Sequence, residues 1–158
     1  MNEHNQVLLL NDTDLDGGHF GCMRVMRTIR AELEERGFVD FQSIKVGTDW
    51  RRDVALCAMI DAARLVVING EGTLHHGKRR GRWLLEAGAR AKAHGGRVAL
   101  INALWQDNPD DWAYLARDFD ILACRDGRSA FELANATGRE VTCLCTIPGH
   151  HREQPAPD

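Results

Sequence analysis

Two glycine-rich stretches carry most of the residue types in this sequence that could do chemistry. The stronger one, Asn69-Gly-Glu-Gly-Thr-Leu-His75-His76, directly follows an apolar, β-branched run. Glycines let the backbone turn sharply and approach a ligand, which leaves amide N–H groups free to point at an anion. The histidines can exchange protons near neutral pH. We therefore expect anion binding and proton transfer here, by Gly70, Glu71, Gly72, Thr73, His75 and His76.

A run of cations follows the same turn. Its members are Lys78, Arg79, Arg80 and Arg82, and they stand just before the next expected helix. Ammonium and guanidinium groups bind phosphate and carboxylate through charge-assisted hydrogen bonds. A charge run is also typical of a solvated surface face. The position directly after a glycine turn favours binding, so we expect these four cations to contact a substrate anion.

The other glycine-rich stretch, residues 11–21, opens the first expected helix and is dense in carboxylates. Asp12, Asp14 and Asp16 match the start of a calcium loop, but Met23 occupies the twelfth position, where that loop needs glutamate. Asp and Gly are also common caps and turn formers at helix starts. A histidine where a strand-end loop meets a helix N-terminus is suited to bind a hydroxyl or a phosphate. The ligand contacts that we expect here are Asn11, Asp14, Gly18 and His19.

Several common classes of site are absent from the sequence. It has no GxGxxG fingerprint, no GxxxxGK[ST] phosphate loop, no GxSxG elbow and no zinc-ligand spacing. His75 and His76 make a poor metal site, because adjacent side chains are expected to diverge and no third ligand has fitting spacing. We therefore expect chemistry on anions, with no metal and no cofactor.

Expected strands and helices alternate along the chain around these residues. Apolar, β-branched runs predict strands, and apolar residues at three- and four-residue steps predict the helices between them. This alternation predicts an α/β fold, a Rossmann-like open parallel sheet with helices on both faces. Ligands of such sheets bind at the carboxyl ends of the strands, which adds Asn102 and Arg125 to the substrate-binding candidates. The expected strands are 7–10, 40–46, 65–69, 97–102, 120–124 and 140–145, and the expected helices are 21–36, about 55–60, 83–93, 112–116 and 129–136.

Composition bounds the class of protein. The chain has 158 residues, 44% of them apolar, and a net charge of −3 from 20 basic and 23 acidic residues. This predicts one domain over 1–147 with a disordered tail over 148–158, and no overall field for nucleic acid or an anionic membrane. The N-terminal residues carry no basic segment, and their apolar run is too short for a signal peptide or a membrane span. We expect a cytoplasmic protein without membrane insertion, whose five cysteines are reduced.

Three motifs, in this order, resemble the polysaccharide pyruvyl transferase family. They are the Asn-Asp…Gly-His-Phe-Gly-Cys loop, the turn from Asn69 to His75, and the Arg125-Asp126-x-x-Ser129-x-x-x-Leu133 element. The resemblance covers about Val7 to Cys145. It implies the N-terminal half of a GT-B-like pair of Rossmann-type domains, which transfers pyruvyl from phosphoenolpyruvate to a pair of glycan hydroxyls as a ketal in cell-surface polysaccharide synthesis.

The resemblance also implies roles for individual residues. His75, oriented by Glu71, would transfer protons or contact the sugar, and His19 with the Asp14 region would face the acceptor hydroxyls. Phosphoenolpyruvate and a sugar or glycan would be the partners. The family pattern continues into a second domain that this chain does not include. We therefore expect a homo-oligomer or a second-domain partner to complete the site.

Two other functions compete with this one. The first is a non-catalytic domain that binds a nucleotide or sugar phosphate and pairs with another chain. The second is an NAD-binding oxidoreductase domain, which needs an acid at the end of the second strand. Lys45 and Gly47 occupy that position, so we rank this function last.

Overall fold

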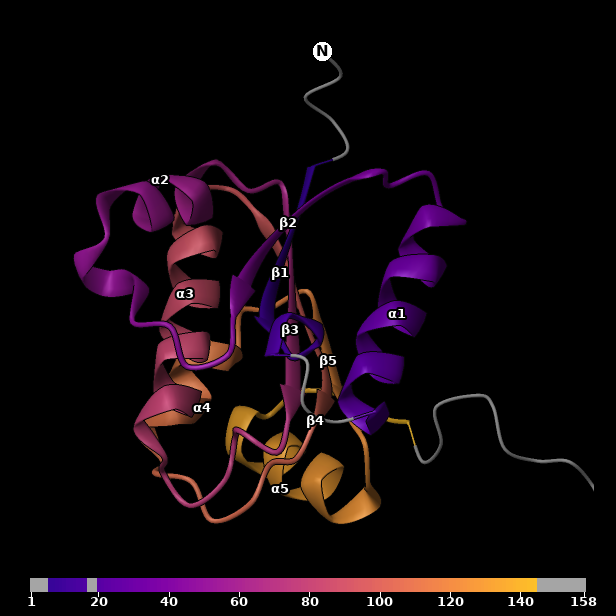
Figure 1. The fold of residues 1–158 in the computed structure, drawn as a ribbon. Helices are drawn as coiled ribbons and strands as arrows, with labels where there is room; N and C mark the ends of the chain where they lie inside the picture. Colours follow the sequence, from indigo (N-terminus) through magenta and orange to yellow (C-terminus); the bar gives the residue numbers. More distant parts are fainter. Residues whose placement is uncertain (1–5, 17–19, 145–158) are drawn as a thin grey trace, which may run out of the picture.

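The computed structural model describes residues 6–16 and 20–144, which form an α/β fold around one parallel sheet (Figure 1). Within these residues, six strands pair in the order β2-β1-β3-β4-β5-β6, and every pair is parallel. The predicted Rossmann-like sheet is confirmed. The strands are β1 (Gln6–Asp12), β2 (Asp40–Lys45), β3 (Leu65–Glu71), β4 (Arg97–Ala103), β5 (Ile121–Cys124) and β6 (Thr142–Cys143).

Helices connect successive strands, and carboxylate caps begin η2, α2 and α5, with Asp49 as the cap of η2. Asp53 accepts hydrogen bonds from the backbone N–H groups of Ala55 and Leu56 at the start of α2. Asp126 accepts one from the Ser129 N–H at the start of α5. Such caps satisfy backbone donors that a helix leaves free. The helices are η1 (Asp14–Asp16), α1 (Phe20–Glu34), η2 (Trp50–Arg52), α2 (Val54–Ala62), α3 (Arg79–Ala93), α4 (Asp111–Ala116) and α5 (Gly127–Thr137).

Helix α3 begins at Arg79, whereas the apolar pattern predicts a start at Trp83. Gly77, with φ +60°, ends the preceding turn, and Lys78 adopts an extended conformation as the N-cap. The expectation that the cations precede the helix is therefore wrong, because Arg79, Arg80 and Arg82 form its first turn. Cations oppose the helix dipole at this end, so this turn favours an anion nearby.

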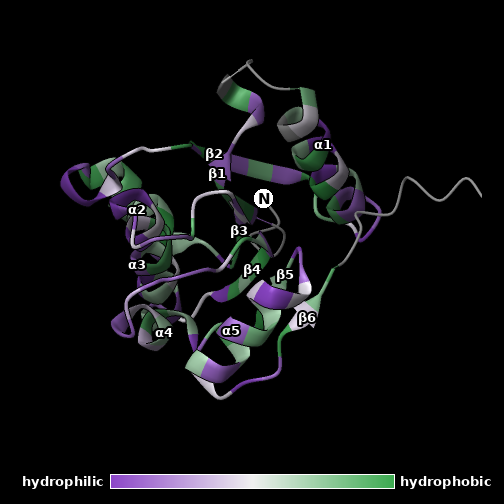
Figure 2. Cartoon of the chain, turned by 90° about the horizontal axis from the view of Figure 1, so that it is seen from below, coloured by the Kyte–Doolittle hydropathy of each residue, from purple (hydrophilic) through white to green (hydrophobic). Residues whose placement is uncertain are grey.

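Helices cover both faces of the sheet, as predicted. Val7 and Leu9 of β1 pack with Met26 of α1 on one face. Leu8 and Leu10 point to the other face, where α2, α3, α4 and α5 contribute to a larger core. In the sheet, β2 lies on one side of β1, whereas the later strands follow one another on the other side. Because the crossovers are right-handed, the helix between β1 and β2, α1, lies on one face of the sheet and the other α-helices lie on the opposite face. Figure 2 shows this arrangement end-on, with α1 across the sheet from α2 and α3.

Because α1 spans only part of its face, an apolar groove of about 460 Å³ remains beside it. Ile121 and Leu144 are 51% and 41% exposed there. The groove is lined chiefly by Val25, Ile29, Val67, Ile101, Ile121 and Leu144.

Of the described cysteines, Cys57 and Cys124 are free thiols. Burial raises the pKa of the Cys124 thiol to about 12, so this cysteine is chemically inert near neutral pH. Within the described ranges, no helix has both the length and the apolar character that crossing a bilayer requires. The predicted tail, 148–158, and the predicted domain end at 147 lie outside the described residues.

Candidate functional site

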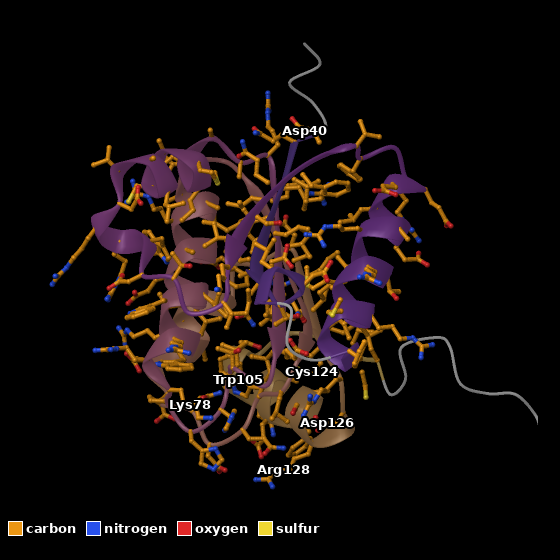
Figure 3. All side chains as sticks on the ribbon, in the orientation of Figure 1. Asp40, Lys78, Trp105, Cys124, Asp126 and Arg128 are labelled. Atoms are coloured by element: carbon orange, nitrogen blue, oxygen red, sulfur yellow. The ribbon has the colours of Figure 1, made fainter. Side chains whose placement is uncertain are left out.

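The candidate site lies at the carboxyl ends of β1, β3, β4 and β5. Adjacent strands β1 and β3 connect onward in opposite directions, and ligands of open α/β sheets bind at such a switch point. Figure 3 labels Lys78, Asp126 and Arg128 at this edge, and Asp40, where β2 begins, at the opposite edge. The loops selected from the sequence therefore do meet at one edge of the sheet.

Asn11 ties the end of β1 to the loop after β3. Its side-chain Nδ2 donates to the carbonyl of Asn69 at 2.7 Å and to Oγ1 of Thr73 at 3.0 Å. The residue is 1% exposed, and its buried Oδ1 atom has no hydrogen-bond partner among residues 6–16 and 20–144. Because a carbonyl only accepts hydrogen bonds, the amide cannot be flipped, and Oδ1 is a fixed, buried acceptor.

Asn69 extends this network to β4 and to Glu71. Asn102 donates to Asn69 Oδ1 at 3.0 Å, and Asn69 Nδ2 donates to Glu71 Oε2 at 3.2 Å and contacts Met26 Sδ at 3.3 Å. The carboxylate of Glu71 is thus held by an amide. Sequence reasoning used Asn69 only to mark the motif, and its central position depends on contacts between neighbouring strands.

Left-handed backbone ends three of these strands. Asn11, Glu71 and Asn102 have φ values of +63°, +36° and +53°. Asparagine tolerates this region better than most residues, whereas glutamate adopts it at a cost in free energy. Strained backbone of this kind is common at ligand sites.

The two glycines of the β3 loop differ in what surrounds them. A Cβ on Gly70 would lie 2.7 Å from Cα and Cβ of Ala103, so this glycine lets β3 and β4 approach each other. A Cβ on Gly72 would meet nothing within 4 Å. Gly72 is exposed, which leaves space for a ligand beside its backbone.

The side chains of His75 and His76 converge. Their Nδ1 atoms are 2.7 Å apart, and Nζ of Lys78 lies 2.8 Å from Nε2 of His75. The expectation that these adjacent side chains diverge is wrong, because His76 has a left-handed φ of +54°. The backbone of His75 also forms an isolated parallel β-bridge with Gln106, which joins the loop after β3 to the loop after β4.

The surroundings of His75 keep its ring neutral at pH 7. Burial lowers the pKa of His75, and the charges of Lys78, His76 and Arg125 lower it further, while a backbone hydrogen bond at Gly72 opposes them. A neutral imidazole accepts a proton readily. Glu71 contacts Asn69 rather than His75, so the expected orienting bond from Glu71 is not formed.

The cations of the basic run point in different directions. Lys78 contacts His75, whereas Arg82 pairs with Glu86 at 2.8 Å and with Asp111 at 2.7 Å. The guanidinium of Arg79 lies 5.1 Å from the Trp83 ring centre. The Arg80 guanidinium lies against Gly47, after β2. Lys78 is therefore the member of this run that the geometry joins to His75.

The loop after β5 is fixed beside the loop after β4. Ser129 Oγ donates to Asp126 at 2.8 Å and accepts from the Trp105 N–H at 3.0 Å. The exposed Arg125 begins this loop and is near enough for its charge to affect His75. Hydrogen bonding to Ser129 lowers the pKa of the Asp126 carboxyl, which is therefore ionised at pH 7.

Asp14 is held by arginines of α1. Its carboxylate lies 3.4 Å from Arg30 and 3.9 Å from Arg27. Arg30 also pairs with the fully buried Asp12, a contact that sequence reasoning missed. Gly18 and His19, the other candidates of this loop, lie outside the described residues.

Neither comparison with known proteins nor a search for metal ligands assigns a function to this site. No family model, curated protein or solved structure matches this chain. In the part of the chain that the structure describes, no three His, Cys, Asp or Glu side chains cluster as a metal site would require. The site is therefore argued from its own geometry.

Proposed function

We propose that this chain is a pyruvyl transferase-like domain that binds phosphoenolpyruvate at the carboxyl edge of its sheet. The observation that carries the proposal is the hydrogen bond between Lys78 and the half-buried His75, with Arg125 nearby. Lys78 and His75 both lie in the loop after β3, and the charge of Arg125, from the loop after β5, acts on His75. These two loops hold two of the three family-like motifs. The third motif includes Asn11, whose amide reaches Asn69 and Thr73.

The donor would bind through its charges. Lys78 and Arg125 both carry positive charge near His75, and phosphoenolpyruvate presents a phosphate and a carboxylate. The open backbone at Gly72 supplies room for one of these groups. Arg82 is held by Glu86 and Asp111, so we assign it to the helix rather than to the donor.

His75 would move the proton. Ketal formation adds a proton to the methylene carbon of the donor, bonds two acceptor oxygens to the central carbon, and releases phosphate. The two acceptor hydroxyls lose one proton each. One of these balances the proton that the methylene carbon gains, and the other leaves with the phosphate. A neutral His75 can take a hydroxyl proton and return it to carbon.

The acceptor would bind on the Asn11 side of the site. Oδ1 of Asn11 is a buried, fixed acceptor with no donor among the described residues, and a hydroxyl of a sugar that enters this side of the site would be a suitable donor. We propose that a second domain or a second chain completes this side. The phosphorylated donor makes the cytoplasm the expected compartment.

Calorimetric titration with phosphoenolpyruvate at low salt tests this function, with UDP and NAD as competing ligands. We expect selective binding of phosphoenolpyruvate that a His75→Gln, Lys78→Met double variant loses. Arg64→Met removes one exposed cation just before β3, at the opposite edge, and should bind like the wild type. Preference for NAD, or equal binding by the double variant, would contradict the proposal.

The apolar groove beside α1 favours a second candidate, a non-catalytic domain that pairs with another chain. Monomeric proteins rarely leave a large contiguous apolar patch exposed. This candidate predicts binding of UDP or a sugar phosphate without pyruvyl transfer. Sedimentation analysis of the wild type and an Ile121→Glu variant tests whether this face drives self-association.

A further inference from the structure

Four side chains form a continuous row of polar contacts at the site, which we call the histidine row: Lys78, His75, His76 and Asp107. Lys78 Nζ lies 2.8 Å from His75 Nε2, and His75 Nδ1 lies 2.7 Å from His76 Nδ1. At the far end, His76 Nε2 lies 3.5 Å from Asp107 Oδ2. A cation thus stands at one end of two imidazoles and an anion at the other.

The charged ends determine where the ring protons lie. A lysine ammonium only donates, so His75 Nε2 must accept. The proton of a neutral His75 is then on Nδ1, which donates to His76 Nδ1. His76 in turn carries its proton on Nε2, which faces the carboxylate of Asp107. Every contact in the row then has one donor and one acceptor.

The opposite arrangement places like groups together. A proton on His75 Nε2 would face the ammonium of Lys78, and an unprotonated His76 Nε2 would face the carboxylate. Two contacts of the row would lose their hydrogen-bonding character. The arrangement with His75 protonated on Nδ1 is therefore the one that the geometry favours for neutral rings.

The backbone and α5 fix the row in place. The His76 N–H donates to the Gln106 carbonyl at 2.9 Å, which holds the two loops together. Asp107 has φ +49°, its N–H donates to Glu132 at 3.4 Å, and Arg128 lies 3.8 Å from its carboxylate. The charged groups around the two rings are therefore Lys78 and Arg125, whose charges act on His75, and Asp107 beside His76, with Arg128 and Glu132 around Asp107.

We propose that His76 and Asp107 are positioning residues that hold His75 in the Nδ1–H tautomer, with Nε2 as its proton-accepting atom. Lys78 covers that atom in the free protein. An anion that draws Lys78 away exposes Nε2 to a proton donor. This part rests on the proposed function: the hydroxyl proton passes to Nε2 as the hydroxyl oxygen bonds to the donor carbon. The positive charge that forms on His75 is then stabilised through His76 by Asp107.

Nitrogen-15 NMR of the imidazole rings tests the tautomer without any activity. At about pH 8 most histidine rings are neutral. We expect His75 to be protonated on Nδ1 and His76 on Nε2. His94, whose Nδ1 lies 2.9 Å from the Arg90 carbonyl, supplies an internal Nδ1–H reference. Finding His75 protonated on Nε2 would overturn the proposal.

Variants separate the contribution of His76 and Asp107 from that of Lys78. Lys78→Met removes the ammonium, and we expect His75 to stay in the Nδ1–H form because His76 still accepts. Lys78→Met with Asp107→Asn should raise the Nε2–H population of His75 severalfold. Asp118→Asn, which removes an exposed acid of another loop, should leave the tautomer of the Lys78→Met protein unchanged. If neither Asp107→Asn nor His76→Phe changes the tautomer populations of His75 in the Lys78→Met protein, the positioning role is contradicted.

Kinetics keep this proposal distinct from the proposed function. Where pyruvyl transfer is measured, Asp107→Asn should lower kcat roughly tenfold with little change in KM, which is less than the loss expected on removing a whole acid–base group. An unchanged kcat would overturn the positioning role. Absence of transfer by the wild type, together with a His75 tautomer that responds to Asp107→Asn in the Lys78→Met protein, would overturn the proposed function and support the positioning role.

Discussion

The side-chain amide of Asn11 donates a 2.7 Å hydrogen bond to the main-chain carbonyl of Asn69, 58 residues away. This bond joins the ends of β1 and β3, the two adjacent strands whose onward connections run in opposite directions. It also fixes the orientation of the amide, so that Oδ1 is buried and has no hydrogen-bond donor among the described residues. Asn11 therefore has a structural function at the site, and its contact with an acceptor stays a prediction.

Asn11→Asp should destabilise the fold. The new carboxylate would face the Asn69 carbonyl, so a buried donor is lost and an acceptor meets an acceptor. We expect a loss of about 2–4 kcal/mol in the free energy of unfolding, measured by urea denaturation. The same change at the exposed Asn135 should alter stability by less than about 0.5 kcal/mol. Equal stabilities for the two variants would show that the Asn11 network does not form.

Gly70→Ala and Gly72→Ala should differ in their effects. The methyl group at residue 70 would lie 2.7 Å from Ala103, and we expect a loss of roughly 1–3 kcal/mol from overpacking. The methyl group at residue 72 meets nothing within 4 Å, so stability should be nearly unchanged. Thermal unfolding checks both. A weaker affinity of the stable Gly72→Ala protein for phosphoenolpyruvate would assign the ligand to this side of the loop.

Arg30→Met should leave a buried charge without its partner. Asp12 is fully buried and pairs with Arg30, which also contacts Asp14 and Ser43. Removing one partner of a buried ion pair costs about 3 kcal/mol, measured by chemical denaturation. Arg27→Met is the matched control, since Arg27 is exposed and its contact with Asp14 is 3.9 Å long. A similar loss in both variants would mean that burial of Asp12 is not what makes Arg30 important.

The state of His75 should depend on pH in a definite direction. Its pKa is lowered in the folded protein, so the unfolded chain binds the proton at higher pH. This part of the stability is complete above the ordinary pKa of about 6.5 and declines as pH falls below it. Lys78→Met should raise the pKa of His75, because the ammonium charge is one of the causes of its lowering.

NMR titration of the His75 ring measures this pKa directly. Arg24→Met removes an exposed cation of α1 that is not among the causes of the shift, and should leave the value unchanged. An unchanged His75 pKa in the Lys78→Met protein would mean that the two side chains are not in contact in solution.

The fold was largely predictable because its signals are local. The β-branched run from Val66 to Ile68 predicts a buried strand, and acidic residues such as Asp126 mark helix starts. The loops that form the site also followed from the sequence, since the carboxyl ends of parallel strands lie at one edge. Helix α3 was predicted to start too late, because Arg79, Arg80 and Arg82 do not contribute to an apolar periodicity.

The order of residues was enough to predict the class of fold, the edge of the sheet that carries polar loops, and the types of residue in them. The folded chain was needed to see that Lys78 contacts His75, that His76 turns toward it, and that Gly70 packs on Ala103. The difference arises because periodicity and capping act between near neighbours along the chain. Contacts such as Asn11 to Asn69, or His76 to Asp107, depend on the pairing of distant strands and on left-handed backbone in individual loop residues.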